Sequence, residues 1–316
     1  MNNDKSPCYV FPSEGGSEAM SVILITGSST GIGMATALYL SKKGHRVYAS
    51  MRNPDRAGEL RKAAAANACS MEIIPLDVND EQSVKTAVAQ VLQREGCIDV
   101  LVNNAGIASL GPLEEVDDAE VNRVFDTNVF GLLRCIRAVL PSMRKQRGGS
   151  IINVGSVAGS IASGCSGIYA ASKFALEALS ESLAQEVKPY GIHVALIKPS
   201  FIVTPIIGKA LEALPSPERS AYPNAVRVSN ALFQSATTIG GPAEMVAATI
   251  EEAMNDRSSR LRYPVGVPAR MVLAARAAMS EEEWVDLGRH ETFEAFNAEF
   301  GSHMPKPPES AAGGGH

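Results

Sequence analysis

The feature that most constrains the fold is a strand, a glycine-rich turn and a helix that follow one another directly near the start of the chain. Residues 21–26 (SVILIT) are apolar and rich in β-branched side chains, which predicts a buried strand. The turn TGSSTGIG comes next, and the Ala- and Leu-rich run after it predicts a helix that ends at Gly44. Gly27, Gly31 and Gly33 would let backbone amides approach a pyrophosphate, which the helix dipole also favours. We expect a nucleotide-binding turn, although a turn with a purely structural role would show the same glycines.

Strand and helix patterns alternate along the rest of the chain. Further strands are predicted at residues 45–52, 71–78, 97–106, 150–156, 193–199 and 260–265. Helices are predicted at residues 54–67, 80–95, 117–147, 168–188 and 241–255. Such alternation builds a parallel sheet with right-handed crossovers. The sequence therefore predicts an α/β fold, a doubly wound Rossmann-type three-layer sandwich of about seven parallel strands with helices on both faces.

The expected domain organisation follows from composition. Residues 1–20 mix Asn, Ser, Gly, Pro and Glu and predict a flexible extension, whereas residues 21–265 predict a single Rossmann-type catalytic domain. Within it, residues 200–240 carry four prolines among apolar residues and predict an irregular lid over the pocket. Residues 266–300 predict a helical extension in which Ser280 and Glu283 form a capping box and Trp284 is a packing anchor. Residues 301–316 predict a disordered tail, whose first four residues resemble a purification-tag remnant.

The chemistry is expected at Tyr169, Lys173 and Ser156. The run IYAASKFALEALSESLAQEVK favours a helix, so Tyr169 and Lys173 should leave the same helix face. A nearby ammonium favours the phenolate and is expected to lower the pKa of the tyrosine toward working pH. The strand at residues 150–156 places the Ser156 hydroxyl at its carboxyl end, where open α/β sheets hold their ligands. A substrate oxygen could sit between Ser156 and Tyr169; the alternative is a surface pair beside a turn serine.

The end of the second strand bears on the choice of cofactor. In the dinucleotide fold, an acid about 20 residues after the glycine turn binds the 2′-hydroxyl of the adenine ribose. Met51 stands at that place, and the guanidinium of Arg52, which follows it, suits a 2′-phosphate. We therefore expect NADP(H), with a solvated strand-end charge as the alternative role of Arg52.

Composition argues against several other classes of protein. The 316 residues are 45% hydrophobic and 20% charged, which is enough to bury a sizeable core. The net charge of -5 with scattered basic residues argues against nucleic acid, and the broken apolar runs argue against a membrane span or a signal peptide. Five isolated cysteines lack metal-ligand spacing, so we expect no metal site, reduced thiols and a cytoplasmic location. Cys165 is expected to be a packing or loop residue rather than a nucleophile.

Several motifs, taken together with their order and spacing, resemble the short-chain dehydrogenase/reductase family over residues 21–265. They are TGSSTGIG at 26–33, NNAG at 103–106, Asn128, Ser156 and the Tyr169/Lys173 pair. VYASMR, GPLEEV, YAASKFALEALSESLA and the long carboxyl extension look most like the branch containing 17-beta-hydroxysteroid and retinol dehydrogenases. One departure is Ser200, where the family usually has glycine, which indicates either an altered substrate fit or a tolerated turn residue.

The resemblance implies a role for each matching residue. The implied catalytic set is Tyr169 as general acid/base, Lys173 as the group that tunes it and binds the nicotinamide ribose, Ser156 as the donor to the substrate oxygen, and Asn128 as the anchor of a proton relay through water. The implied cofactor set is Gly27, Ser29, Ile32 and Gly33 at the pyrophosphate, Asp77 and Val78 at the adenine, Asn104 at the neighbouring ribose, and Ile202 with Thr204 at the nicotinamide carboxamide.

The leading hypothesis is an NADP(H)-dependent oxidoreductase that acts on a carbonyl or alcohol of an apolar, steroid-like or retinoid-like molecule. The alternatives are a non-catalytic cofactor-binding regulatory protein, and a lyase or epimerase that uses the same tyrosine. Two helices carry apolar residues beyond one face, which together with the resemblance predicts a homodimer or homotetramer. These residues are Val121, Phe125, Val129 and Leu132 in the first helix, and Phe174, Leu176, Leu179 and Leu183 in the second.

Overall fold

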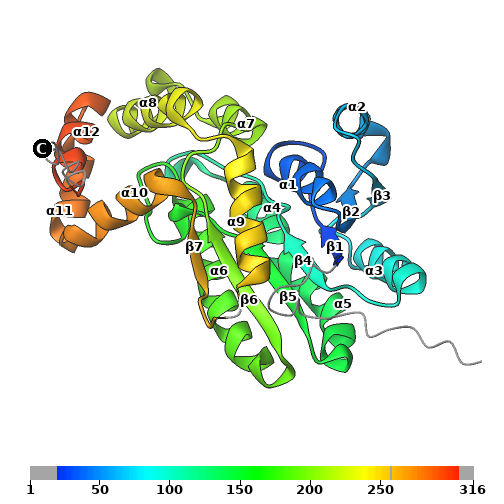
Figure 1. The fold of residues 1–316 in the computed structure, drawn as a ribbon. Coiled ribbons are helices and arrows are strands. Elements are labelled where there is room, and N and C mark those ends of the chain that lie inside the picture. The colour runs from blue at the N-terminus through cyan, green and yellow to red at the C-terminus, as the bar shows by residue number, and fades with distance from the viewer. Residues whose placement is uncertain (1–19, 257, 306–316) are drawn as a thin grey trace, which may run out of the picture.

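Seven parallel strands form one sheet in the computed structural model, which describes residues 20–256 and 258–305 (Figure 1). The strands are β1 Val22–Ile25, β2 Arg46–Met51, β3 Met71–Pro75, β4 Val100–Asn103, β5 Gly149–Val154, β6 Ile192–Lys198 and β7 Arg262–Pro264. They lie in the order β3-β2-β1-β4-β5-β6-β7, and every neighbouring pair is parallel. The predicted fold class is confirmed. The expectations for residues 1–19 and 306–316 lie outside the described residues.

Helices cover both faces of the sheet because alternate strand residues point to opposite sides. Leu24, Leu101 and Ile151 pack against one helix layer, and their neighbours Ile23 and Val102 pack against the other. The first layer is α3 Glu81–Glu95, α5 Gly131–Gln146 and α6 Gly167–Val187, and the second is α1 Gly31–Lys42, α2 Gly58–Ala66 and α9 Ala243–Asn255. No helix within the described ranges is long and apolar enough to cross a membrane.

The long helix expected at residues 117–147 contains a wide turn near its middle. It consists of α4 Asp118–Phe125, a π-helical turn at Asp126–Phe130, and α5. The Asp117 carboxylate caps its start by accepting the backbone N–H of Glu120 at 2.8 Å. Single π-turns within helices occur often at functional sites. This one contains Asn128, and it determines where that side chain points.

Residues 200–240 are largely helical, so the expectation of an irregular segment is wrong. α7 spans Pro205–Ala213 and α8 spans Pro223–Ile239, with a 3-10 turn between them at Pro217–Arg219. Pro205 and Pro223 each occupy the first position of a helix, where the fixed φ of proline and its missing N–H are both tolerated. These prolines therefore begin helices rather than prevent them. Both helices follow the carboxyl end of β6 and lie beyond one end of the sheet (Figure 1).

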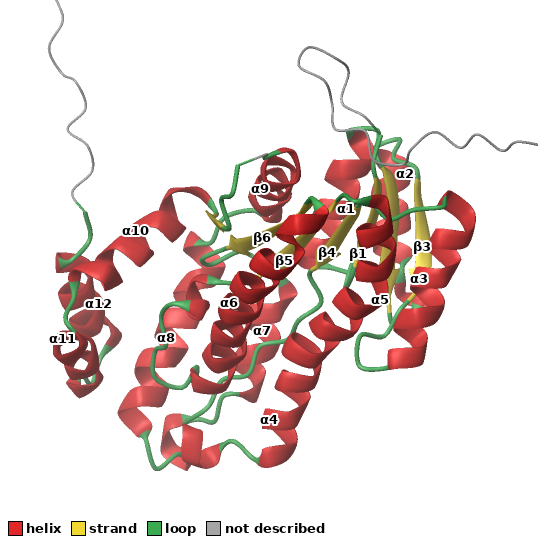
Figure 2. Cartoon of the chain, turned by 90° about the horizontal axis from the view of Figure 1, so that it is seen from below, coloured by secondary structure: helices red, strands yellow, loops and turns green. Residues whose placement is uncertain are grey.

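The last three described helices pack around their own small core, to one side of the sheet (Figure 2). They are α10 Gly266–Ala278, α11 Glu281–Asp286 and α12 Phe293–Ser302. The expected capping box of Ser280 and Glu283 is present, and the Trp284 ring lies 5.9 Å from the Phe300 ring between centroids. α12 includes residues 301 and 302, and Met304 packs on the same core, so the tail boundary expected at residue 301 is wrong. Phe300 is buried in this core, and α12 continues for two residues beyond it.

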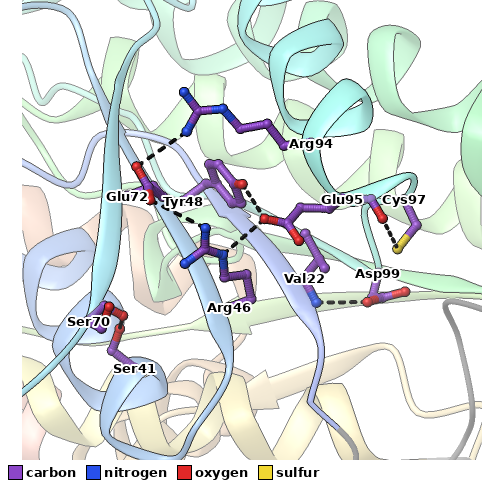
Figure 3. A network of polar contacts seen from close by, with 10 residues as sticks. All are labelled: Val22, Ser41, Arg46, Tyr48, Ser70, Glu72, Arg94, Glu95, Cys97 and Asp99. Carbon is purple, nitrogen blue, oxygen red and sulfur yellow. Dashed lines mark hydrogen bonds and ion pairs between the residues drawn. The ribbon is translucent and has the colours of Figure 1, made fainter.

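Charged side chains tie the strands together at the amino-terminal end of the sheet (Figure 3). Arg46 of β2 bonds to Glu95 of α3 at 3.0 Å and to Glu72 of β3 at 3.3 Å. The hydroxyl of the fully buried Tyr48 donates to Glu95 at 2.5 Å. Asp99 accepts the backbone N–H of the first β1 residue at 2.7 Å, and burial raises the pKa of its carboxyl to about 6. This network stabilises the sheet at the end opposite the glycine turn.

Candidate active site

The glycine turn lies where the strand order reverses, between β1 and β4, the usual place for a ligand in an open parallel sheet. Gly27 (φ +70°) and Gly31 (φ +58°) adopt left-handed backbone conformations that favour glycine. A Cβ on Gly33 would lie 2.4 Å from the carbonyl oxygen of Gly27. Ser29, just before α1, and Ile32, in its first turn, are both partly exposed. The turn leaves backbone amides accessible at a helix N-terminus, so it fits the pyrophosphate of a dinucleotide.

Asn104 holds this turn in place from the end of β4. Its Nδ2 donates to the carbonyl oxygens of Thr26 at 2.9 Å and Gly27 at 3.1 Å. The Thr26 hydroxyl in turn accepts the backbone N–H groups of Asn104 and Ala105, both at 3.0 Å. The Asn104 side-chain amide is therefore hydrogen-bonded to the protein backbone. Asn104 acts on the cofactor site by shaping the turn, and its expected contact with a ribose stays a proposal.

Arg52 is an exposed cation that directly follows β2. The backbone N–H of Ser28 donates to the carbonyl oxygen of Ser50 at 2.9 Å, which ties the glycine turn to this strand end. Arg52 follows two residues later and is exposed. Met51 is only 3% exposed and packs in the core, and its expected place beside the adenine ribose stays a prediction. Of the two neighbouring side chains, Met51 is therefore buried and Arg52 is exposed.

Asp77 and Val78 follow β3, near the predicted adenine position. Asp77 is partly exposed, and its carboxylate accepts the backbone N–H of Asn79 at 3.0 Å. Val78 is 7% exposed, and a Cβ on Gly131 would lie 2.8 Å from its Cγ2, so the valine packs tightly under α5. Arg134 of α5 donates to the Val78 carbonyl at 3.0 Å. These contacts fix the backbone at the edge of the expected adenine site.

Ser156, Tyr169 and Lys173 come together at the carboxyl end of β5. The Ser156 hydroxyl accepts the backbone N–H of Ala158 at 3.1 Å and also hydrogen-bonds with Tyr169. Tyr169 lies in the first turn of α6, and Lys173 Nζ is 5.7 Å from the centroid of its ring. Lys173 Nζ donates to the carbonyl of Val154 at 2.9 Å, so the end of the strand fixes the ammonium. The structure thus brings together the three side chains on which the catalytic hypothesis depends.

Burial controls the ionisation of the pair. It lowers the pKa of Lys173 from 10.5 to about 8, because a buried ammonium loses its water. Burial also raises the pKa of Tyr169, and the hydrogen bond with Ser156 opposes this rise only in part. The expected lowering of the Tyr169 pKa by Lys173 is therefore wrong for this structure. Desolvation of the phenolate outweighs the hydrogen bond with Ser156, which favours the protonated form of Tyr169 when no cofactor or substrate is bound.

Asn128 positions the loop after β4 and the catalytic helix at once. It is 2% exposed; its Oδ1 accepts the Ile107 backbone N–H at 2.8 Å, and its Nδ2 donates to the Ile107 carbonyl at 2.9 Å. The same Nδ2 donates to the Ser172 hydroxyl at 2.9 Å, and that hydroxyl donates to the Tyr169 carbonyl at 2.7 Å. Sequence reasoning missed Ser172, whose signal is its place in YAASK, three residues after the tyrosine. The water relay expected at Asn128 stays a proposal.

Ile202 and Thr204 close the site on the side of the glycine turn. Ile202 pairs with Gly241 in an isolated parallel bridge. The Thr204 hydroxyl donates to the carbonyl oxygen of Ile202 at 3.3 Å. A Cβ on Gly31 would lie 3.2 Å from Cγ2 of Thr204, so the start of α7 lies against the turn. Ser200 does not adopt a positive φ; the described non-glycine residues that do so are Ala68, Arg147 and Cys165. Ser200 is thus an unstrained turn residue.

Cys165 is a buried packing residue beside the site, as expected. Its side chain is 8% exposed, and burial raises the pKa of the thiol to about 11. A thiol with that pKa is a poor nucleophile near neutral pH. Its carbonyl accepts the backbone N–H of Gly111 at 2.7 Å, which joins the loop before α6 to the segment that follows β4.

Comparison with known proteins gives one consistent result. The sequence profile described as short chain dehydrogenase matches residues 21–214. An uncharacterized oxidoreductase of Bacillus subtilis, YusZ, is 33% identical over 277 residues, which cover 86% of this chain and 98% of that protein. A short-chain dehydrogenase from Streptomyces avermitilis is similar in structure, with a TM-score of 0.72 and 34% identity over 86% of this chain and all of that one.

Two vertebrate relatives are more similar over a shorter stretch. Human 17-beta-hydroxysteroid dehydrogenase type 1 is 42% identical over 199 residues, which cover 61% of this chain and 60% of that protein. Bovine retinol dehydrogenase 8 is 40% identical over 205 residues, which cover 64% of this chain and 65% of that protein. Each match thus spans less than two thirds of the relative.

Proposed function

Because the chain belongs to the short-chain dehydrogenase family, within which it resembles the branch of 17-beta-hydroxysteroid and retinol dehydrogenases, we propose an NADP(H)-dependent oxidoreductase that interconverts a ketone or aldehyde and an alcohol. The observation that carries this proposal is the meeting of Ser156, Tyr169 and Lys173 beside a glycine turn shaped for a pyrophosphate. A nicotinamide cofactor, when bound, supplies or accepts the hydride.

The side chains of this protein handle the proton. In the direction of reduction, the Ser156 hydroxyl donates a hydrogen bond to the carbonyl oxygen and holds it beside Tyr169. As negative charge develops on that oxygen, the Tyr169 hydroxyl transfers its proton and the alcohol forms. The Lys173 ammonium, 5.7 Å from the ring, favours the phenolate that is left. Oxidation of the alcohol reverses these steps, with the Tyr169 phenolate as the base.

An apolar substrate of steroid-like or retinoid-like bulk is supported by two observations. The names of the two vertebrate relatives refer to a hydroxysteroid and to retinol. In addition, α7 and α8 are amphipathic helices beyond the carboxyl end of the sheet, and their buried residues include Ile207, Ala210 and Val226. We propose that these two helices form the lid over the substrate.

NADP(H) is the proposed cofactor because of Arg52. The exposed guanidinium lies at the strand end tied to the glycine turn, and the neighbouring Met51 offers no carboxylate to a ribose. A guanidinium pairs well with the 2′-phosphate that distinguishes NADP(H) from NAD(H).

A panel of ketones and alcohols with both nicotinamide cofactors tests the proposal. NADPH should be consumed with apolar ketones, and the same protein should reduce NADP+ with the matching alcohols. Tight cofactor binding without turnover on any substrate would favour the regulatory alternative. Turnover of substrate without net consumption of cofactor would favour the lyase or epimerase.

A homodimer or homotetramer is proposed from exposed aromatic residues on the helices that cover β4 and β5. Phe130 is 51% exposed and Phe174 is 43% exposed. Much of the apolar surface expected to pair copies belongs instead to the core, namely Val129, Leu132, Leu176 and Leu183. The proposed contact is therefore smaller than the sequence suggests and is centred on the two phenylalanines. A monomeric mass by light scattering at micromolar concentration would contradict it.

A further inference from the structure

Two adjacent carboxylates hold the chain between α7 and α8. The Glu115 carboxylate accepts a hydrogen bond from the Ser220 hydroxyl, and Oγ of Ser220 lies 2.9 Å from each of the two carboxylate oxygens. The same carboxylate accepts the backbone N–H of Ala221 at 2.7 Å. Glu114 accepts the hydroxyl of Tyr222. The Ser220 Oγ also accepts the Tyr222 backbone N–H at 2.9 Å, which orients the serine toward Glu115. Three consecutive residues of one segment are thus bound by two consecutive residues of another.

The segment that carries these carboxylates touches the start of the catalytic helix. Glu114 and Glu115 belong to a short 3-10 turn, Leu113–Glu115, in the chain that follows β4. A Cβ on Gly167, the first residue of α6, would lie 2.7 Å from Cδ2 of Leu113. Tyr169 is two residues further along the same helix. A contact made at Glu115 is therefore made beside the helix that carries the proton donor.

The other end of the α7–α8 segment rests on the cofactor side. Thr204 lies against Gly31 of the glycine turn, and α7 begins directly after it. The segment therefore starts at the glycine turn and is bound again at Glu115, whose 3-10 turn lies against the start of the helix that carries Tyr169. The two attachment points of the segment thus lie at the glycine turn and beside the start of the catalytic helix.

We propose that Glu115 is a positioning residue: it holds the α7–α8 segment over the catalytic groups, and the segment in turn positions the substrate. The part of this proposal that concerns the substrate rests on the proposed function. The hydrogen bonds of Glu115 fix Ser220 and Ala221, and through them the direction in which α8 begins. All of these contacts are at least partly exposed to water, so each stabilises the closed segment only modestly. The segment can consequently be released and bound again in each turnover.

Proteolysis tests the contact without any need for turnover. The peptide bond after Arg219 lies directly before Ser220, and Arg219 is exposed, so trypsin can report whether the segment is held. We expect Glu115→Ala to speed cleavage after Arg219 at least about threefold, as loss of about 0.7 kcal/mol from the closed state would do. The control is Asp118→Ala, which removes an exposed carboxylate three residues away and should leave the cleavage rate unchanged.

Steady-state kinetics tests whether the contact positions substrate. Glu115→Ala should raise KM for an apolar ketone about three- to tenfold, leave kcat within about twofold and leave the cofactor Kd unchanged, since only substrate binding needs the closed segment. Ser220→Ala should act in the same way, and the double variant should be no worse than either single one. The melting temperature should stay within about 1 °C, because exposed contacts contribute little to global stability.

The outcomes separate this inference from the proposed function. Unchanged cleavage after Arg219 together with unchanged KM would overturn the positioning role. A large fall in melting temperature, with faster cleavage throughout the chain, would also overturn it in favour of a general structural role. Faster cleavage only after Arg219, in a protein that turns over no substrate of the panel, would support the contact while the proposed oxidoreductase activity failed.

Discussion

The two sides of the candidate site are held by different kinds of contact. On the sheet side the polar groups are buried: Lys173 is 6% exposed and bonds to a strand carbonyl, and Asn128 is 2% exposed and makes three hydrogen bonds. On the lid side, α7 and α8 are joined by a segment that exposed carboxylates hold, among them Glu115. One side is fixed within the core of the fold, and the other is attached to its surface.

This difference indicates a division of labour. Buried hydrogen bonds are costly to break, so the sheet side keeps the proton donor in one geometry for any substrate. Exposed hydrogen bonds exchange readily with water, so we expect the proposed lid to open, admit a bulky molecule and close. Changes on the sheet side should therefore be large and independent of substrate. Changes on the lid side should be small and should depend on substrate size.

The largest effect is expected from Tyr169→Phe, on the sheet side. The substitution keeps the ring but removes the hydroxyl proton, so kcat should fall at least about a hundredfold. The loss should be the same for small and bulky substrates. Cofactor binding, measured by fluorescence titration, should persist because the glycine turn is untouched. Near-normal turnover, or a loss that depends on substrate size, would remove the distinction between the two sides.

A pH dependence should follow from the buried Lys173. Its pKa is about 8, so between pH 7 and pH 9 the ammonium form falls about tenfold, and kcat/KM for carbonyl reduction should fall with it. Unfolding would not explain this loss. A lysine whose folded pKa lies below its unfolded value of 10.5 binds fewer protons in the folded state, so its contribution to stability rises from pH 8 to pH 10.5. A pH profile of kcat/KM beside melting temperatures distinguishes the two causes, and a flat profile over this range would contradict the assignment.

The sheet side of the site was predictable from the sequence because short local motifs determine its geometry. Its geometry depends on local patterns: a glycine turn between strand and helix, and a tyrosine and lysine one helical turn apart. The ionisation of Tyr169 was not predictable, because it depends on how much water neighbouring elements exclude. The burial of the Met51 side chain was likewise not predicted, since it depends on how β2 packs against the core.

The lid side was predicted poorly because its structure depends on contacts that are distant in sequence. Pro205 and Pro223 suggested loops, yet each begins a helix whose apolar face is covered by other parts of the chain. The contact of Glu115 with Ser220 joins residues 105 positions apart, and neither residue belongs to a recognisable motif. Such contacts can be found only once the fold has placed both segments.

Arg52→Ala tests the cofactor end of the sheet side. A charge-assisted pair with a 2′-phosphate at an exposed position should contribute about 1.4 kcal/mol, so the preference for NADP(H) over NAD(H) should fall about tenfold. The measurement is kcat/KM with both cofactors, at a fixed ionic strength because the contact is exposed. Arg56→Ala is a matched control, since Arg56 is exposed in the 3-10 turn that follows this strand. Met51 is best left unchanged, because an acid there would be buried in the core.

A wild-type preference for NAD(H), or an Arg52→Ala variant with an unchanged ratio of the two cofactors, would contradict this role of Arg52. A similar change of the cofactor ratio in the Arg56→Ala variant would indicate that the preference comes from the general positive charge at this strand end rather than from one contact.

The smallest effect is expected within the lid, from Phe233→Leu. The Phe233 ring of α8 meets the Phe201 ring in an edge-on contact, with centroids 5.8 Å apart and planes at 76°. Such a pair contributes about 0.5–1.5 kcal/mol beyond its buried area; both rings are partly exposed, so we take about 0.5–1 kcal/mol, and its loss should shift KM for a bulky ketone about two- to fivefold. KM for a small ketone and the cofactor Kd should not change, because neither requires the lid to pack closely.

Phe296→Leu provides the matched control for this substitution. Phe296 stacks on the Phe300 ring at 6.3 Å between centroids, but in the carboxyl-terminal helical unit rather than in the lid. Replacing the Phe296 ring by a leucine side chain should lower the melting temperature of the protein and leave KM unaltered for every substrate. If Phe233→Leu instead reduced kcat equally for small and bulky ketones, the lid would share in positioning the reacting groups, and the proposed separation between the two sides of the site would be wrong.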